Sequence, residues 1–235
     1  MSVEFVRKDE NDEFIVPLTI RIAQHYSETR ESKAYFIKII RTKWDYSDDF
    51  KKLKLIIKNF YSFEDGDEIN SIFEQIFSFS GCNDEVTVNK IRGALAEGVL
   101  LGTYGKSIIN AKSFGWGANV KLLSDNKLNA WKIKYSCPKH CDSNFSNCYS
   151  RETIDLGIWD GDCGEFFECK TRPSSIGWPE INYMKELDKA LNKKKIEHKL
   201  YFATTDTVEN TRLSLTEKFP NEHFYEIISL QDSIA

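Results

Sequence analysis

Three ionisable side chains lie within one short stretch, TIDLGIWDGDCGEFFECKTRP, at residues 153–173. Twelve residues separate Asp155 from Glu168, and Lys170 is the second residue after Glu168. Two carboxylates can hold Mg²⁺, which takes oxygen ligands and keeps several of its water molecules. A lysine beside them can orient or deprotonate an attacking water, or neutralise charge that develops in the transition state. These residue types favour metal-assisted hydrolysis of a phosphodiester.

The same stretch predicts a β-hairpin that would bring these side chains together. With a turn at residues 160–163, Asp155 lies opposite Glu168, and Leu156 lies opposite Phe167. Directly opposed residues share one face of an antiparallel pair, and two like charges there destabilise an ordinary sheet. A divalent cation between the two carboxylates would remove that repulsion, with the backbone carbonyl of Cys169 as a third oxygen ligand. The alternative is a solvated face on which Lys170 pairs with one of the carboxylates.

The elements around the hairpin predict an α/β domain preceded by helices. Residues 14–80 have helical periodicity, including helices over residues 48–63 and 68–79. Residues 85–104 predict a strongly apolar helix with Glu97 in its middle. A buried carboxylate needs a partner, which would be the metal, Arg92 or a neighbouring backbone group. The order from residue 86 onward is helix, four strands, helix, strand, helix, strand, which indicates a mixed α/β fold.

Asp155 and the Glu168-Cys169-Lys170 run resemble the D-x(n)-ExK signature of the PD-(D/E)xK nuclease superfamily. The residue before Asp155 is Ile154, where the family name has a proline. The resemblance covers roughly residues 86–230 and implies a restriction-endonuclease-like mixed sheet flanked by helices. It implies that Asp155 and Glu168 are metal ligands, that Lys170 is the catalytic lysine, and that Glu97 is an accessory acid. We therefore expect a mainly helical region over residues 1–82, for interaction or dimerisation, and a nuclease-like domain over residues 83–235.

Two further groups of residues are candidate binding sites. The first follows Lys170 and could contact substrate phosphates, although a polar connection to the next helix explains it equally well. It consists of Thr171, Arg172, Ser174 and Ser175. The second could hold a structural Zn²⁺, with incidental reduced thiols as the alternative, because its spacing matches no common zinc pattern. It consists of Cys137, His140, Cys141 and Cys148.

Composition and charge limit the class of protein. The chain has 235 residues, of which 41% are hydrophobic and 29% charged, so it is expected to fold rather than remain disordered. Its net charge of −4 is unlike the basic character of proteins that bind nucleic acid non-specifically. The charged N-terminus lacks the apolar segment of a signal peptide, and no apolar run is long enough to span a bilayer, which predicts a cytoplasmic protein.

The residues and the resemblance together predict a Mg²⁺-dependent nuclease, with Mn²⁺ as a substitute metal. Family frequency favours DNA over RNA as the substrate, and endonucleolytic cleavage in restriction or another anti-phage defence system. The near-neutral charge and the helical N-terminal region suggest a homodimer or a protein partner such as an ATPase or helicase subunit. The alternative is a catalytically inactive nuclease-fold module that binds DNA or protein as one subunit of a complex.

Overall fold

The chain forms two compact units in a computed structural model. The model describes residues 2–8, 12–42, 66–79, 84–123, 130–138 and 150–232, together with Trp44 and Leu55. The sheet unit comprises Met1–Glu10 and Lys106–Ser229, and the helical unit comprises Asn11–Gly105 and Leu230–Ala235. This division differs from the predicted boundary at residues 82 and 83. The N-terminal residues belong to the sheet, and the apolar helix expected to begin the nuclease-like domain packs within the helical unit.

Close helix packing explains why the apolar helix belongs to the helical unit. That unit contains α1 (Ile15–Glu28), α2 (Lys33–Arg41), α4 (Gly66–Ser78) and α5 (Glu85–Thr103). Helix α1 packs along α5, where Gly98 has no side chain and the Cβ of Ile22 can approach closely. Asp84 caps α5 by accepting a hydrogen bond from the Thr87 N–H at 2.8 Å. Among the described residues, no helix is both long enough and apolar enough to cross a membrane.

The helix predicted over residues 68–79 is confirmed as α4. Its predicted apolar stripe is fully buried, and it consists of Ile69, Ile72, Phe73 and Ile76. The helix predicted over residues 48–63 lies outside the described residues, apart from Leu55.

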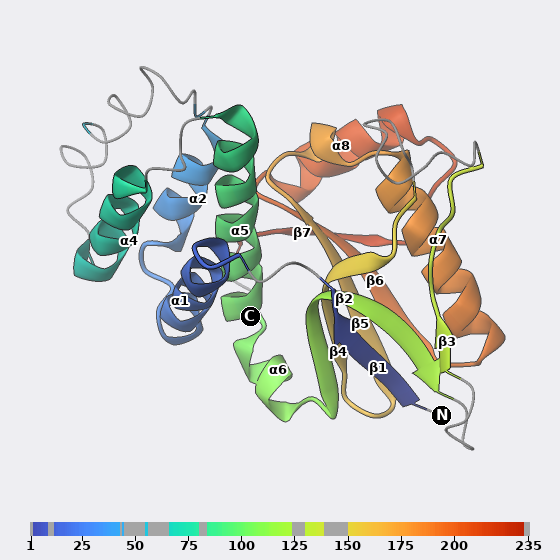
Figure 1. Cartoon of the computed structure of the whole chain (residues 1–235). Coiled ribbons are helices and arrows are strands. Elements are labelled where there is room, and N and C mark those ends of the chain that lie inside the picture. The colour runs from blue at the N-terminus through green and yellow to red at the C-terminus, as the bar shows by residue number, and fades with distance from the viewer. Residues whose placement is uncertain are drawn as a thin grey trace. The chain divides into compact units, whose positions relative to one another are not determined.

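The sheet unit contains a mixed seven-stranded sheet. Figure 1 shows helices beside this sheet. Its strands are β1 (Ser2–Arg7), β2 (Ser113–Leu123), β3 (Ala130–Lys132), β4 (Thr153–Trp159), β5 (Cys163–Lys170), β6 (Glu197–Thr204) and β7 (Glu226–Ser229). Its helices are α6 (Gly105–Asn110), the 3₁₀ turn η1 (Pro173–Ser175), α7 (Trp178–Lys193) and α8 (Val208–Lys218). The α/β class is confirmed, and the predicted order of elements from residue 86 onward holds except for the short helix α6, which was not predicted and lies before the four strands.

Strand order runs β1-β2-β4-β5-β6-β7, and β3 pairs with β2. The pairs β1–β2, β2–β4 and β4–β5 are antiparallel, whereas the pairs β5–β6 and β6–β7 are parallel. Strand β1 was not predicted, and it adds an edge to the sheet by pairing Ser2–Arg7 with β2. Helix α7 provides the crossover that two neighbouring parallel strands require, here β5 and β6.

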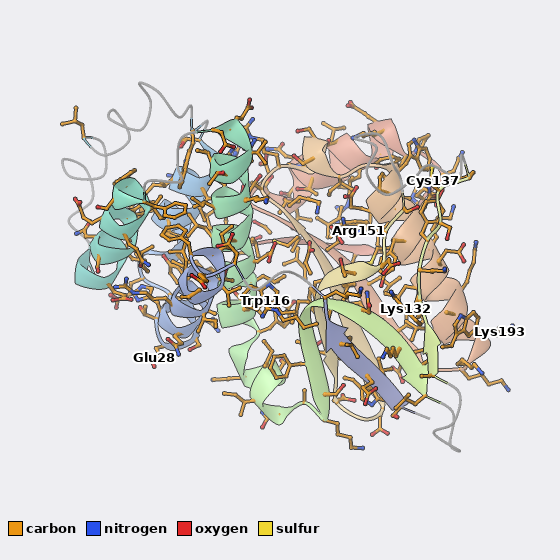
Figure 2. All side chains as sticks on the ribbon, in the orientation of Figure 1. Glu28, Trp116, Lys132, Cys137, Arg151 and Lys193 are labelled. Carbon is orange, nitrogen blue, oxygen red and sulfur yellow. The ribbon has the colours of Figure 1, made fainter. Side chains whose placement is uncertain are left out.

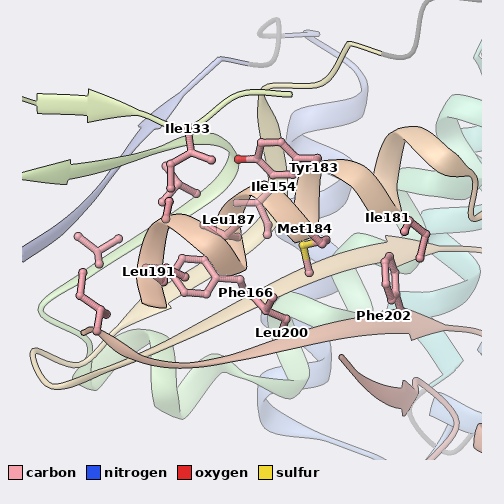
Figure 3. Close-up of a cluster of buried hydrophobic side chains, with 14 of the residues drawn as sticks. Ile133, Ile154, Phe166, Ile181, Tyr183, Met184, Leu187, Leu191, Leu200 and Phe202 are labelled. Carbon is pink, nitrogen blue, oxygen red and sulfur yellow. The ribbon is translucent and has the colours of Figure 1, made fainter. Parts of the chain in front are cut away.

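The core of the sheet unit lies between the strands and α7. Tyr183, Met184 and Leu187 of α7 are fully buried against Phe166 of β5 and Phe202 of β6, and Figure 3 shows these side chains together. Burial of one such side chain contributes about 1.5–3 kcal/mol. This packing fixes α7 on the sheet and sets the N-terminal turn of α7 near the end of the hairpin.

Candidate functional site

The hairpin has the predicted register. Strands β4 and β5 pair Leu156 with Phe167, and the pairing continues to the turn in the same register. Asp160 holds the turn, because its Oδ1 accepts hydrogen bonds from the N–H groups of Asp162 and Cys163 at 2.7 and 2.8 Å. Gly161 has a φ of 119°, which a residue with a side chain rarely adopts. The turn therefore fixes the register of the two strands. One residue beyond the pair of Leu156 and Phe167, the same register sets Asp155 opposite Glu168.

The three predicted side chains meet beyond Leu156 and Phe167. The Oδ2 atom of Asp155 accepts a hydrogen bond from the Cys169 N–H at 2.7 Å, which holds this carboxylate between the two strands. The Lys170 Nζ donates to Glu168 Oε1 at 2.5 Å and lies 3.8 Å from Asp155 Oδ2. Glu168 is fully buried, whereas Asp155 and Lys170 retain some exposure. The structure thus brings the two carboxylates and the lysine into direct contact.

Two more charged residues complete this group, and neither was predicted from the sequence. Arg151, located in Figure 2, donates from Nη2 to Glu168 Oε1 and lies 3.4 Å from Asp155 Oδ1. Its Nη1 donates to Glu180 Oε1 at 3.2 Å. Lys170 Nζ also lies 3.8 Å from Glu180 Oε1. We call Arg151, Asp155, Glu168, Lys170 and Glu180 the charged cluster.

Hydrogen bonds with nearby backbone groups hold Arg151 and Glu180 in position. The backbone of Arg151 is paired with that of Tyr135, with N···O distances of 2.9 and 2.8 Å. Glu180 lies in the first turn of α7, and its Oε2 accepts a hydrogen bond from the Gly177 N–H at 2.8 Å. Two signals in the sequence point to them. Arg151 lies four residues before Asp155, a spacing that keeps side chains on one face of a strand, and GWPE has Pro and Glu where helix N-termini favour them.

Burial and neighbouring charges change the proton affinity of each member. Burial, together with repulsion from Asp155, raises the pKa of Glu168 from 4.5 to about 7, although Arg151 and Lys170 oppose this shift. Burial also opposes the charge on Asp155, but Lys170, Arg151 and the Cys169 N–H outweigh it and lower the pKa of Asp155. Burial likewise opposes the charge on Lys170, yet Glu168 and Asp155 outweigh it and raise the pKa of Lys170. Asp155 is therefore ionised and Lys170 protonated at neutral pH.

The donor atoms of the charged cluster suit a hard divalent cation. Asp155, Glu168 and Glu180 supply carboxylate oxygens from three different elements, and Mg²⁺ prefers such ligands. Glu168 Oε2 is buried and has no hydrogen-bond partner among the described residues, so one oxygen is left for a ligand. Within those same residues, however, no group of three or more His, Cys, Asp or Glu side chains surrounds a common metal position. In this arrangement the three carboxylates are instead paired with Arg151 and Lys170.

The remaining predicted metal ligands stay predictions. Glu97 is half-buried in α5 and belongs to the helical unit. The Cys169 N–H is engaged by Asp155, and a role for its carbonyl as a metal ligand is untested. Of the four residues predicted to bind zinc, Cys137 is buried, and its N–H donates to the Ser150 hydroxyl at 2.8 Å. His140, Cys141 and Cys148 lie outside the described residues.

The residues predicted to bind substrate follow β5 directly. Thr171 and Arg172 are half-buried, whereas Ser174 and Ser175 are exposed in the 3₁₀ turn. This segment is held by its backbone, because the Thr205 hydroxyl donates to the Thr171 carbonyl, and Lys218 Nζ donates to the Ser174 carbonyl at 3.2 Å. The segment therefore lies beside Lys170 in a fixed conformation, and phosphate binding by its side chains remains a prediction.

Comparisons with known proteins do not identify the chain. No family model matches it, and no curated protein matches it. Among solved structures it is similar to protein VC1899 from Vibrio cholerae, with a TM-score of 0.41 and 8% sequence identity. The match covers 97% of this chain but only 55% of that protein, so the chain spans little more than half of its length. A likeness this weak supports no conclusion about family or function, and the charged cluster has to be interpreted from its own chemistry.

Proposed function

We propose that the protein is a metal-dependent phosphodiesterase of the nuclease class, acting on DNA. The observation that carries this proposal is the direct contact of Asp155, Glu168 and Lys170 at the end of one hairpin. Asp155 and Glu168, with Glu180 beside them, would hold Mg²⁺ or Mn²⁺. The metal would supply Lewis acidity and a bound water of lowered pKa.

The chain's own residues would orient the reacting groups. The Cys169 N–H fixes the Asp155 carboxylate. The raised pKa of Lys170 keeps its amine protonated, so Lys170 acts as a cation and not as a general base. From its position it would stabilise the negative charge that develops on the phosphate. Thr171 and Arg172 would contact the neighbouring phosphates. A role in anti-phage defence, dimerisation and an ATPase or helicase partner belong to the same proposal and rest on the resemblance alone.

Plasmid cleavage by the purified chain tests this proposal. We expect nicking with Mg²⁺ or Mn²⁺, none with EDTA, and a loss of on the order of 10²-fold or more in Lys170→Ala, the size seen when one group that stabilises transition-state charge is removed. Lys170→Arg should retain part of the activity, because it keeps the charge. The matched control is Lys189→Ala, since Lys189 pairs only with Glu186 among the described acidic side chains, on the exposed side of α7. Cleavage by Lys170→Ala at the wild-type rate would refute the proposal.

A second candidate function is a non-catalytic module that binds DNA or protein. The contacts of Arg151 favour it, because a guanidinium that pairs with all three carboxylates, together with Lys170, can hold the charged cluster without any metal. In that case Asp155→Asn would weaken folding but leave binding to a DNA duplex unchanged, and no metal-dependent cleavage would occur. Electrophoretic mobility of a duplex with wild type and Asp155→Asn, with and without Mn²⁺, separates the two candidates.

A further inference from the structure

The guanidinium of Arg151 pairs with every carboxylate of the charged cluster. It contacts a carboxylate from each of three elements: Asp155 of β4, Glu168 of β5 and Glu180 of α7. A metal ion held by these same carboxylates would have to bind at the point where they converge. Lys170 Nζ also lies within 3.8 Å of the same three carboxylates, so Arg151 and Lys170 together take the place of that ion in this arrangement.

The contacts between Arg151 and the carboxylates leave hydrogen-bonding capacity unused. An arginine commonly binds one carboxylate through two parallel N–H···O bonds. Arg151 instead divides its Nη2 between Glu168 and Asp155 and directs its Nη1 to Glu180. Among the described residues, Arg151 Nε and Glu168 Oε2 are both buried and have no hydrogen-bond partner. Buried polar atoms are nearly always paired. These contacts therefore leave part of the hydrogen-bonding capacity of both side chains unsatisfied.

Charge also favours an exchange of cations. With every member ionised, three carboxylates face the two cations Arg151 and Lys170, which leaves one negative charge. If a divalent cation takes the place of Arg151, the three carboxylates, Lys170 and the metal sum to zero. The metal and the guanidinium would compete for the same ligand atoms, because Glu168 Oε1, Asp155 Oδ1 and Glu180 Oε1 all accept hydrogen bonds from Arg151.

We propose that Arg151 closes the site as an internal counter-cation and that a divalent metal displaces it. This inference rests on the proposed function and concerns regulation of the same site. The Arg151 side chain is 19% exposed, so it can rotate toward solvent, while its backbone stays paired with Tyr135. Metal affinity is then set by competition with Arg151, and the released guanidinium has the planar, permanently charged form that suits a substrate phosphate.

Titration with Mn²⁺ tests this competition, using calorimetry or the electron paramagnetic resonance signal of free Mn²⁺. Arg151→Gln removes the internal cation, and Arg212→Gln removes an exposed arginine of α8 in the same unit as the matched control. We expect Arg151→Gln to bind Mn²⁺ at least about tenfold more tightly than wild type, because one strong repulsion is lost. Arg212→Gln should bind as wild type does.

The outcomes separate the two proposals. If wild type binds Mn²⁺ and Arg151→Gln binds it no more tightly, the competition is refuted while the metal-dependent function stands. If wild type and both variants fail to bind at millimolar Mn²⁺, the metal-dependent function falls, and this inference falls with it.

Labelling of the wild-type protein gives the answer even if Arg151→Gln does not fold. Phenylglyoxal modifies exposed arginines, and mass spectrometry locates the modified residues. Mn²⁺ should accelerate modification of Arg151 and leave that of Arg212 unchanged. An unchanged or slower rate at Arg151, with Mn²⁺ bound, would overturn the inference.

Discussion

Replacement of Glu168 by glutamine should remove a pH dependence of the free energy of unfolding that arises from the burial of Glu168 in the charged cluster. Glu168 is fully buried, and burial raises its pKa from 4.5 to about 7. A carboxyl group with a raised pKa binds its proton more tightly in the folded state than in the unfolded state. Its contribution to stability is therefore complete below pH 4.5 and is lost as the pH rises through about 7.

The size of this effect follows from the difference between the two pKa values. Each pKa unit corresponds to about 1.4 kcal/mol, so the wild type should lose about 3 kcal/mol of this contribution across the whole window. Asp155 and Lys170 do not contribute there, because the pKa of Asp155 is lowered and that of Lys170 is raised, and both stay charged. Glutamine resembles the protonated form of Glu168 and cannot titrate.

Urea unfolding of wild type and Glu168→Gln at about pH 5 and about pH 8 measures the effect. We expect the stability of wild type relative to Glu168→Gln to fall by most of those 3 kcal/mol between the two conditions. Comparison within each pH cancels groups that titrate in both proteins. Glu197→Gln, at an exposed position at the start of β6, controls for loss of a glutamate. A difference between wild type and Glu168→Gln that is the same at both pH values would refute this account of the cluster.

Thermal unfolding followed by circular dichroism tests the packing on which each unit depends. In α5, Gly98→Ala should lower the melting temperature by the equivalent of about 1–3 kcal/mol, because the new Cβ would lie 2.8 Å from the Cβ of Ile22. Gly93→Ala is the matched control in the same helix; a Cβ there would meet no described atom within 4 Å, so it should stabilise by up to about 1 kcal/mol. In the sheet, Gly157→Ala should destabilise strongly, since its Cβ would lie 2.1 Å from the ring of Phe5. Equal melting temperatures for Gly98→Ala and Gly93→Ala would contradict the packing of α1 on α5.

The contact of Asp155, Glu168 and Lys170 could be predicted because it depends on local pattern. The turn residues 160–163 fix how β4 and β5 align, and alternation along the strands then decides which side chains meet. The order of elements after residue 86 followed from the change between a period of two and a helical period. Both kinds of signal lie within a few residues of the positions they describe.

Contacts that depend on packing between separate elements could not be predicted in the same way. Arg151 precedes β4 and Glu180 lies in α7, and only the packing of α7 on the sheet brings Glu180 to the hairpin. Strand β1 pairs with β2 more than 100 residues away. The alternation of Val3 and Phe5 with polar neighbours in SVEFVR is a strand signal, but it does not say which strand is its partner. Assignment of α5 to the helical unit likewise depended on contacts with α1.

The two candidate functions differ in which group the Lys170 amine must contact. In the charged cluster, Lys170 is held by Glu168 at 2.5 Å, and its amine is protonated. A non-catalytic module needs only this ion pair, because Lys170 and Arg151 together compensate the charge of the buried carboxylate. A nuclease needs Lys170 to face the substrate phosphate, which requires Glu168 to gain another cation in exchange. The exchange of Arg151 for a divalent metal would provide that cation, so the same event that opens the metal position would also free Lys170 for its part in the reaction.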